Sequence, residues 1–177
     1  MKRILTAEQV RRALDRLYKA IVAELPAAGR IAVIGIRTRG ETLAGRIVER
    51  LRAEQYKRRV HHGVLDITFY RDDLSRRRGA PLVRATEIDF DIDDTHAVLV
   101  DDVLHTGRSV RAALDALHDF GRPKVIRLAV LIDRGGRELP IAADFVGRRV
   151  SAKDTKRVQV RLKDNDGEEG VFIINRY

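Results

Sequence analysis

The chain has 177 residues, which suits a single domain over residues 1–177 and is too short for two separate enzyme domains. It contains no cysteine, which excludes disulfides, thiol catalysis and cysteine-ligated metal centres. No apolar stretch reaches the roughly 18 residues of a membrane span, so we expect a cytoplasmic protein with no membrane partner. The net charge of +9 favours polyanions as partners; alternatively, the basic residues only fill solvated surfaces.

The first predicted element is a helix from about residue 6 to residue 25. Thr6 and Gln9 form a capping box at its start, and apolar residues follow at helical spacing. The apolar run 31–36 then predicts a buried strand. It leads into the loop 37–40 and a helical pattern that extends to about residue 51. These segments predict one strand, loop and helix unit of an α/β fold.

The middle of the chain repeats this order. Alternating apolar and polar residues over 65–70 predict a half-buried strand, and the polar stretch of about 71–84 predicts a mobile loop. Residues 97–100 and 125–132 predict two more buried strands. The helix between them is expected to have on its buried face Val110, Ala113, Leu114 and Leu117.

Strands that alternate with helices predict an α/β fold with a mostly parallel, doubly wound sheet. The end of the chain departs from this order. Two apolar runs within about residues 157–175, separated by a turn at 164–167, predict an antiparallel β-hairpin.

The strongest chemical signal lies over residues 97–109. An apolar strand is followed by two acids and then by a glycine and hydroxyl residues at the start of a helix, namely Asp101, Asp102, Thr106, Gly107, Arg108 and Ser109. Such a helix start offers N–H groups and a favourable field to a phosphate. Adjacent carboxylates can accept hydrogen bonds from a ribose diol and can lie close to a magnesium ion. The segment therefore predicts a sugar phosphate site.

This segment resembles the phosphoribosyl pyrophosphate (PRPP) motif of type I phosphoribosyltransferases. Residues 34–40, 65–74 and 131–141 narrow the resemblance to the PyrR family, whose members regulate pyrimidine operons through RNA and carry uracil phosphoribosyltransferase activity. The resemblance covers about residues 5–162. It implies the type I phosphoribosyltransferase fold with a small hood, and the joining of uracil to PRPP to give UMP and diphosphate. A purine or orotate phosphoribosyltransferase shares only the PRPP motif.

The resemblance also implies roles outside that motif. The loop expected to hold diphosphate, partly through backbone amides freed by an unusual peptide geometry, consists of Arg37, Thr38, Arg39 and Gly40. Two arginines and a glycine after a strand favour the same role. A lid loop over about residues 71–84 would begin with Arg71, Asp72 and Asp73. Candidates for contacts with the nucleotide or its base are Arg134 and Val158, and residues 145–147 resemble part of the hood.

As a regulator, a PyrR protein would bind a hairpin in pyrimidine-gene (pyr) mRNA, with UMP or UTP raising its affinity, on a face of a homodimer or larger homo-oligomer. The basic candidates for this surface are Arg12, Arg16, Lys19, Arg137 and Arg148. Four residues depart from the family pattern: Asp15, Gly136 and Ala142, and His105 where Tyr is usual. Asp15, Gly136 and Ala142 lie where the RNA surface is expected, and residues 151–152 interrupt a further family segment. These departures leave open the alternative of a uracil phosphoribosyltransferase that has lost RNA binding.

The sequence has no typical metal-site spacing. Neither His61 and His62 nor the acids of residues 89–94 follow a known ligand pattern. The resemblance implies Mg²⁺ as cofactor, held mainly by the substrate near Asp101 and Asp102 and not by a dedicated protein cage. No residue is assigned to the deprotonation of uracil.

Overall fold

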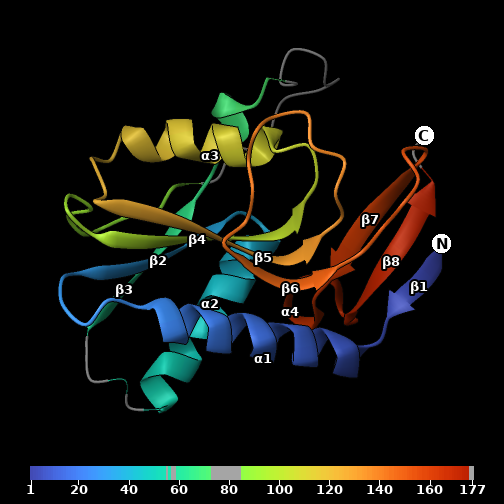
Figure 1. Ribbon diagram of the computed structural model, residues 1–177, viewed down its shortest axis with the longest axis horizontal. Coiled ribbons are helices and arrows are strands. Elements are labelled where there is room, and N and C mark those ends of the chain that lie inside the picture. Colours follow the sequence, from blue (N-terminus) through green and yellow to red (C-terminus); the bar gives the residue numbers. More distant parts are fainter. Residues whose placement is uncertain (55, 57–58, 73–84, 176–177) are drawn as a thin grey trace.

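The computed structural model describes residues 1–54, 56, 59–72 and 85–175, and its largest element is a five-stranded sheet (Figure 1). The strands, in the order β3-β2-β4-β5-β6, span Val60–Leu65, Ile31–Ile36, His96–Leu104, Val125–Asp133 and Phe145–Arg149. Every neighbouring pair is parallel. The predicted α/β fold with a parallel sheet is therefore confirmed.

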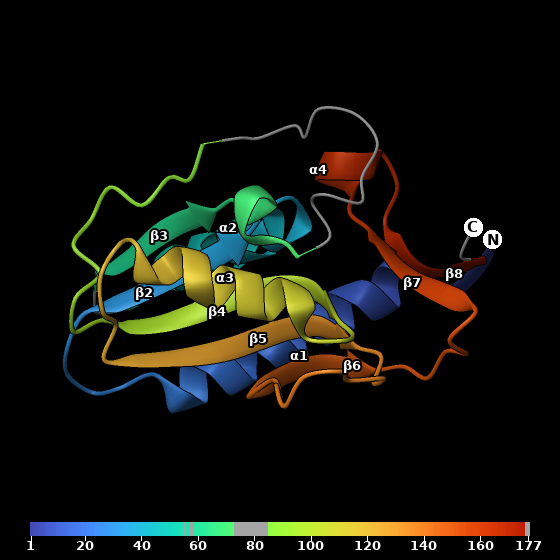
Figure 2. The same ribbon diagram turned by 90° about the horizontal axis from the view of Figure 1, so that it is seen from above.

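Helices cover both faces of this sheet (Figures 1 and 2). Helices α1 (Ala7–Glu24) and α2 (Arg39–Ala53) pack on one face and α3 (Arg108–His118) packs on the other. All six residues of β2 are buried, as expected for a strand covered on both sides. The capping box is present: Thr6 Oγ1 accepts from the Gln9 N–H and Gln9 Oε1 accepts from the Thr6 N–H. Among the described residues, no helix is long and apolar enough to cross a membrane.

A second sheet of three antiparallel strands stands beside the first, and we call it the hood sheet (Figure 2). Its order is β1-β8-β7, with strands Lys2–Leu5, Gly170–Asn175 and Lys156–Arg161. The predicted hairpin is thus present as β7 and β8, joined through the short helix α4 (Lys163–Asp166). The sequence predicted neither β1 nor α4. Four residues such as β1 carry little periodicity, and β1 is a strand only through its pairing with β8.

Three details of the sequence prediction are wrong. The strand expected over 65–70 ends at Leu65, because the chain turns at Asp66, whose carboxylate accepts from the Thr68 N–H, and continues as the 3₁₀ helix η1 (Thr68–Tyr70). Phe69 is consequently 67% exposed. Leu114 also lies at the surface, because α3 buries its alanine face instead. Residues 145–147 belong to β6, an edge strand of the parallel sheet, and not to the hood sheet.

Candidate active site

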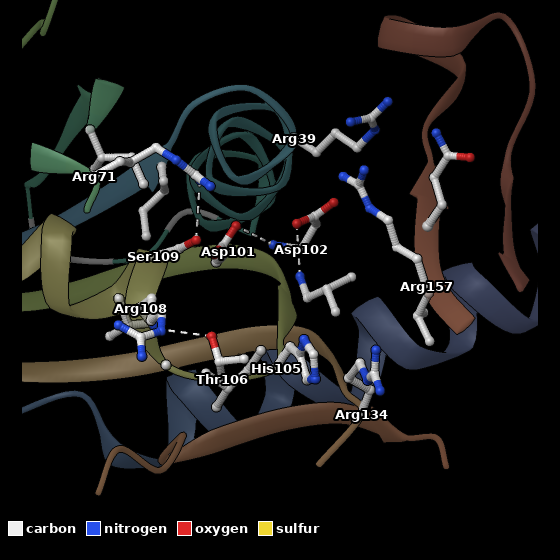
Figure 3. Close-up of a pocket in the computed structure, with 18 of the residues that line it drawn as sticks. Arg39, Arg71, Asp101, Asp102, His105, Thr106, Arg108, Ser109, Arg134 and Arg157 are labelled. Atoms are coloured by element: carbon white, nitrogen blue, oxygen red, sulfur yellow. Dashed lines mark hydrogen bonds between the residues drawn. The ribbon is translucent and has the colours of Figure 1, made fainter. Parts of the chain in front are cut away.

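A cavity of about 860 Å³ lies where the carboxyl ends of β2 and β4 face the hood sheet (Figure 3). Open parallel sheets bind ligands at this edge. The structure brings together here nearly all the residues assigned to the sugar phosphate, diphosphate, lid and base contacts. The assigned residues that line the cavity are Arg37, Thr38, Arg39, Arg71, Asp72, Asp101, Asp102, Thr106, Gly107, Arg108, Ser109, Arg134 and Val158. Gly40 lies behind this wall, and Asp73 falls outside the described residues.

The two acids lie at the end of β4. Asp101 is 8% exposed, and its Oδ1 accepts a hydrogen bond of 2.8 Å from the Asp102 N–H, while Asp102 Oδ1 accepts one of 2.8 Å from the Val103 N–H. Burial raises the pKa of Asp101 well above its ordinary value, and the charge of Asp102 raises it further. Burial also raises the pKa of Asp102, which Arg39 partly opposes. Perturbed carboxyls in a cavity are typical of a functional site.

The loop that follows β4 ends in Gly107, the N-cap of α3. Gly107 has φ of +93°, a left-handed conformation that favours glycine, and a side chain there would press on Leu139 and Ile141. Thr106 Oγ1 accepts from the Arg108 N–H, and Ser109 Oγ accepts from Arg71 at 3.5 Å. Hydroxyls and a helix start therefore face the cavity beside the paired acids, as a phosphate site requires.

The loop after β2 carries Arg37 and Arg39, which both line the cavity, and Arg39 lies on the other side of the acids from Thr106 (Figure 3). The peptide bond between Arg37 and Thr38 is cis, which matches the unusual geometry that the resemblance implied. Arg37 pairs with Glu87 at 2.5 Å, and Arg39 pairs with Asp166 of α4 at 2.5 Å. Gly40 brings this loop close to β4, because a Cβ on it would lie 2.4 Å from the Val100 carbonyl oxygen.

The remaining walls come from the lid segment and the hood sheet. Asp72 receives hydrogen bonds from Arg108 at 2.7 Å and Arg111 at 3.1 Å, so the described start of the lid segment lies against α3. Arg134 has a side chain only 3% exposed, and its Nη1 donates to the Lys156 carbonyl of the hood sheet at 3.1 Å. Val158 lines the cavity from β7.

Several lining residues were not predicted as site residues, among them His105, Glu138, Arg157, Gln159 and Asn175. Arg157 faces the cavity from β7, opposite Asp102, and His105 lies beside Thr106 (Figure 3). A Cβ on Gly136, which has φ of +71°, would lie 3.1 Å from the His105 Nε2. Two of the four departures from the family pattern are thus neighbours in space, and the imidazole occupies the room that a side chain at position 136 would need.

The RNA candidates lie away from the cavity and differ in their contacts. On α1, Arg12, Arg16 and Lys19 are all exposed; Arg12 pairs with Glu8 and Lys19 pairs with Asp15. Arg148 is exposed on β6.

Arg137 is held internally. It donates from Nε to the Ile141 carbonyl (2.9 Å), from Nη1 to the His105 carbonyl (2.9 Å) and from Nη2 to Asp133 (2.7 Å). Its guanidinium therefore braces the segment after β5 against the loop after β4.

No group of three or more metal-ligating side chains occurs in the part of the chain that the structure describes. The cavity does contain two adjacent carboxylates, Asp101 and Asp102, and carboxylate oxygen is the ligand type that Mg²⁺ prefers. Two acids without a third protein ligand fit an ion that is held mostly by a bound phosphate compound, as implied by the resemblance.

The fold is shared with purine phosphoribosyltransferases. The hypoxanthine phosphoribosyltransferase of Trypanosoma cruzi has a TM-score of 0.69 at 18% identity, covering 100% of this chain and 98% of that one. The hypoxanthine-guanine enzyme of Leishmania tarentolae has a TM-score of 0.69 at 14% identity, with the same coverage. At these identities the likeness establishes the fold alone.

Sequence comparisons establish the family. Residues 1–165 match the phosphoribosyl transferase domain. The bifunctional protein PyrR of Roseiflexus sp. is 55% identical over 98% of this chain and 94% of its own length. The bifunctional protein PyrR of Pelotomaculum thermopropionicum is 50% identical over 97% of this chain and 94% of its own length. The chain therefore belongs to the PyrR family of phosphoribosyltransferase-domain proteins.

Proposed function

We propose that the cavity binds PRPP and uracil and converts them to UMP and diphosphate, and that the protein also regulates pyrimidine biosynthesis genes through their mRNA in the cytoplasm. As a PyrR-family member, the protein is a uracil phosphoribosyltransferase and a pyrimidine gene regulator. The observation that carries the enzymatic role is that three groups of residues line one cavity: the paired acids, a helix start with hydroxyl side chains, and a loop with two arginines.

Each of these three groups of residues fits one part of PRPP. Asp101 and Asp102 accept hydrogen bonds from the two ribose hydroxyls. The loop of residues 106–109 holds the 5-phosphate through its N–H groups and hydroxyls. The loop of residues 37–40 holds the diphosphate through Arg37 and Arg39.

The reaction needs no protein nucleophile. Uracil N1 attacks the anomeric carbon as the bond from that carbon to the diphosphate oxygen breaks. The electron pair of that bond leaves with diphosphate, and the proton of N1 is released to the diphosphate or to water. Positive charge develops on the ribose near Asp101 and Asp102, while negative charge develops on the leaving group near Arg37 and Arg39. Catalysis is then positioning and electrostatic stabilisation.

Mg²⁺ is the proposed cofactor, and when bound it would neutralise charge on the diphosphate. Asp101 and Asp102 are the residues beside which it would be held. The described start of the lid, Arg71 and Asp72, contacts the helix start through Ser109 and Arg108. A lid of residues 71–84 that includes Asp73 would exclude water from the reacting carbon.

The base is proposed to lie between Arg134 and Val158. These residues face the cavity from the end of β5 and from the hood sheet, so a planar ring between them is enclosed by both sheets. The buried Arg134 already ties the two sheets together. A base bound here would therefore contact both the parallel sheet and the hood sheet.

The regulatory role is proposed for the exposed basic residues outside the cavity. Arg16 and Arg148 are exposed, and Arg12 and Lys19 share one helix face with Arg16. Arg137 would shape this surface, because three of its five N–H donors are used internally. Exposed basic side chains on such a surface can contact the phosphates of RNA. The proposed partner is a pyr mRNA hairpin, bound more tightly with UMP or UTP in the cavity, by a homodimer or larger homo-oligomer.

Two assays test the proposal. The enzyme should form a nucleotide from PRPP and Mg²⁺ with uracil, and not with hypoxanthine, guanine or orotate. Equal use of a purine would contradict the assignment. Binding of the organism's own pyrimidine leader RNA, measured with and without UMP at a stated salt concentration, separates the bifunctional protein from a uracil phosphoribosyltransferase that has lost RNA binding.

A further inference from the structure

The turn of the hood sheet contacts one face of α2 at three positions. Arg39 pairs with Asp166, Thr42 Oγ1 lies 2.8 Å from Asn165 Oδ1, and Arg46 pairs with Asp164 at 2.8 Å. The α2 residues are spaced by three and four, so they lie on the same side of the helix. The sequence predicted only a turn at residues 164–167, and the proposed reaction gives this turn no part.

Only one of the two ion pairs reaches the cavity. Arg39 lines the cavity, whereas Arg46 does not. Arg39 donates to Asp166 from both Nε, at 3.0 Å, and Nη2, at 2.5 Å. This bidentate contact fixes the plane of the guanidinium and uses one edge of it, so the Nη1 group points away from Asp166. Asp102 acts electrostatically on the same arginine from within the cavity.

Asp166 is itself held firmly. Its side chain is 17% exposed, and its Oδ2 accepts a hydrogen bond of 2.9 Å from the Leu162 N–H at the end of β7. Burial alone would raise the pKa of Asp166, but the hydrogen bonds from Arg39 and from the Leu162 N–H hold it below its usual range. The carboxylate is therefore charged at neutral pH and anchored to the backbone of the hood sheet.

We propose that Asp166 is a positioning residue for the diphosphate of PRPP: it holds the Arg39 guanidinium at the cavity wall in the orientation that binds the leaving group. The inference rests on the proposed function, in which Arg39 contacts the diphosphate. An arginine without such a partner must be ordered on binding, which weakens affinity. Asp166 removes that cost and places the hood sheet in contact with the leaving-group site.

The test compares two substitutions in one turn. Asp166→Asn keeps an oxygen for the Leu162 N–H but loses the ion pair with Arg39. Asp164→Asn is the control in the same turn: it removes one ion pair from Arg46, which lies outside the cavity and keeps its second partner, Glu169, at 2.5 Å. Magnesium diphosphate and UMP are titrated separately into each variant by calorimetry, and kcat and the KM for PRPP are measured with uracil.

Asp166→Asn should weaken diphosphate binding and raise the KM for PRPP by about fivefold to tenfold, with UMP affinity within twofold of wild type. Asp166→Glu should recover most of the loss. Asp164→Asn should leave both ligands within twofold. The proposal would be overturned if Asp166→Asn weakened the binding of diphosphate and of UMP equally, or if Asp164→Asn caused the same loss. It would also be overturned if Asp166→Asn bound diphosphate more tightly, because Asp166 would then compete with diphosphate for Arg39.

A double-mutant cycle with Arg39→Ala tests whether Asp166 acts through that arginine. The double variant should bind diphosphate no more weakly than Arg39→Ala alone, whereas additive losses would overturn the proposal. Thermal unfolding of each variant shows whether the fold is retained. If wild type forms no UMP, the proposed function fails, and the positioning role is then decided by the diphosphate titrations alone.

Discussion

The carboxylate of Asp101 accepts a hydrogen bond from the backbone N–H of Asp102, so two neighbouring acids are packed against each other at one buried strand end. Burial raises the pKa of both acids, and the charge of Asp102 raises that of Asp101 further. The folded protein thus holds carboxylates where their charged form is disfavoured. Such an arrangement opposes folding and is explained by ligand binding.

Asp101→Asn combined with Asp102→Asn should abolish UMP formation, because the amides cannot replace two charged acceptors for the ribose hydroxyls. A loss of about 10²-fold to 10⁴-fold is expected from two charge-assisted hydrogen bonds. Turnover of uracil and PRPP, followed by the appearance of UMP, measures it. Activity within twofold of wild type would remove both acids from the site.

The same substitution should stabilise the protein at pH 7. A raised pKa means that the protonated acid is favoured in the folded state, so its stabilising effect is complete below the ordinary pKa of 3.8 and is lost as pH rises through the folded value. In the amide variant both side chains are neutral at every pH, so this stability is not lost as the pH rises. Its melting temperature should exceed that of wild type at pH 7, by about 2–4 °C for each kcal/mol, and the difference should shrink below pH 4. A melting temperature lower than wild type at pH 7 would contradict this.

Gly40→Ala should damage the diphosphate loop without changing any charge. The new methyl group would lie 2.4 Å from the Val100 carbonyl oxygen, so the start of α2 must move away from β4. Overpacking of this kind costs about 1–3 kcal/mol, and the KM for PRPP should rise about tenfold. Gly45→Ala is the control in the same helix, because its methyl group would meet only His62 at 3.9 Å. Equal kinetics in the two variants would refute the close-approach argument.

Arg148→Ala should lower the affinity for pyrimidine leader RNA and reduce the slope of log affinity against log salt by up to about one. Arg148 is exposed, and within the described ranges it has no ion pair shown by the structure. UMP formation should be unaffected. Filter binding at several salt concentrations measures the slope, and wild-type affinity with wild-type slope would show that this surface does not bind RNA.

Arg137→Ala should behave differently from Arg148→Ala. Its guanidinium holds His105, Ile141 and Asp133 in place, so its loss should lower the melting temperature and weaken RNA binding through displacement of residues 134–141. The salt slope should stay near the wild-type value, because no phosphate contact is removed directly. A slope reduced as in Arg148→Ala would instead assign Arg137 to direct RNA contact.

Removal of Mg²⁺ by a chelator should stop UMP formation and leave the melting temperature of the ligand-free protein unchanged. In the proposal the ion is held mainly by the bound substrate beside Asp101 and Asp102, so its removal should not affect the fold of the ligand-free protein. Calorimetric melting with and without chelator is the check. A large drop in melting temperature would reveal a structural metal.

Local signals allowed much of the fold to be predicted. Thr6 and Gln9 mark the start of α1, and the buried run of β2 is visible because both of its faces are covered. The PRPP motif predicts the paired acids and the phosphate loop because one short segment contains both. The prediction of a strand after Leu65 was wrong, because the hydrogen bond from the Thr68 N–H to the Asp66 carboxylate stabilises a turn where the alternating polarity predicted a strand.

What the sequence did not predict depends on contacts between distant segments. The partner of Arg39 is 127 residues away, and the His105 carbonyl contacted by Arg137 is 32 residues away. No spacing rule connects such residues. Arg157 faces the cavity only because the hood sheet is placed opposite β4, which depends on how the two sheets pack and not on the pattern within β7.

The pairing of β1 with β8 has a consequence for synthesis on the ribosome. β1 is made early, yet among the described residues the strand that it pairs with is β8, residues 170–175. All five strands of the parallel sheet are complete once Arg149 has been added. The nascent chain therefore contains every strand of its larger sheet before the hood sheet can close, and the cavity, whose walls include residues 157–159 and 174–175, can be completed only after that.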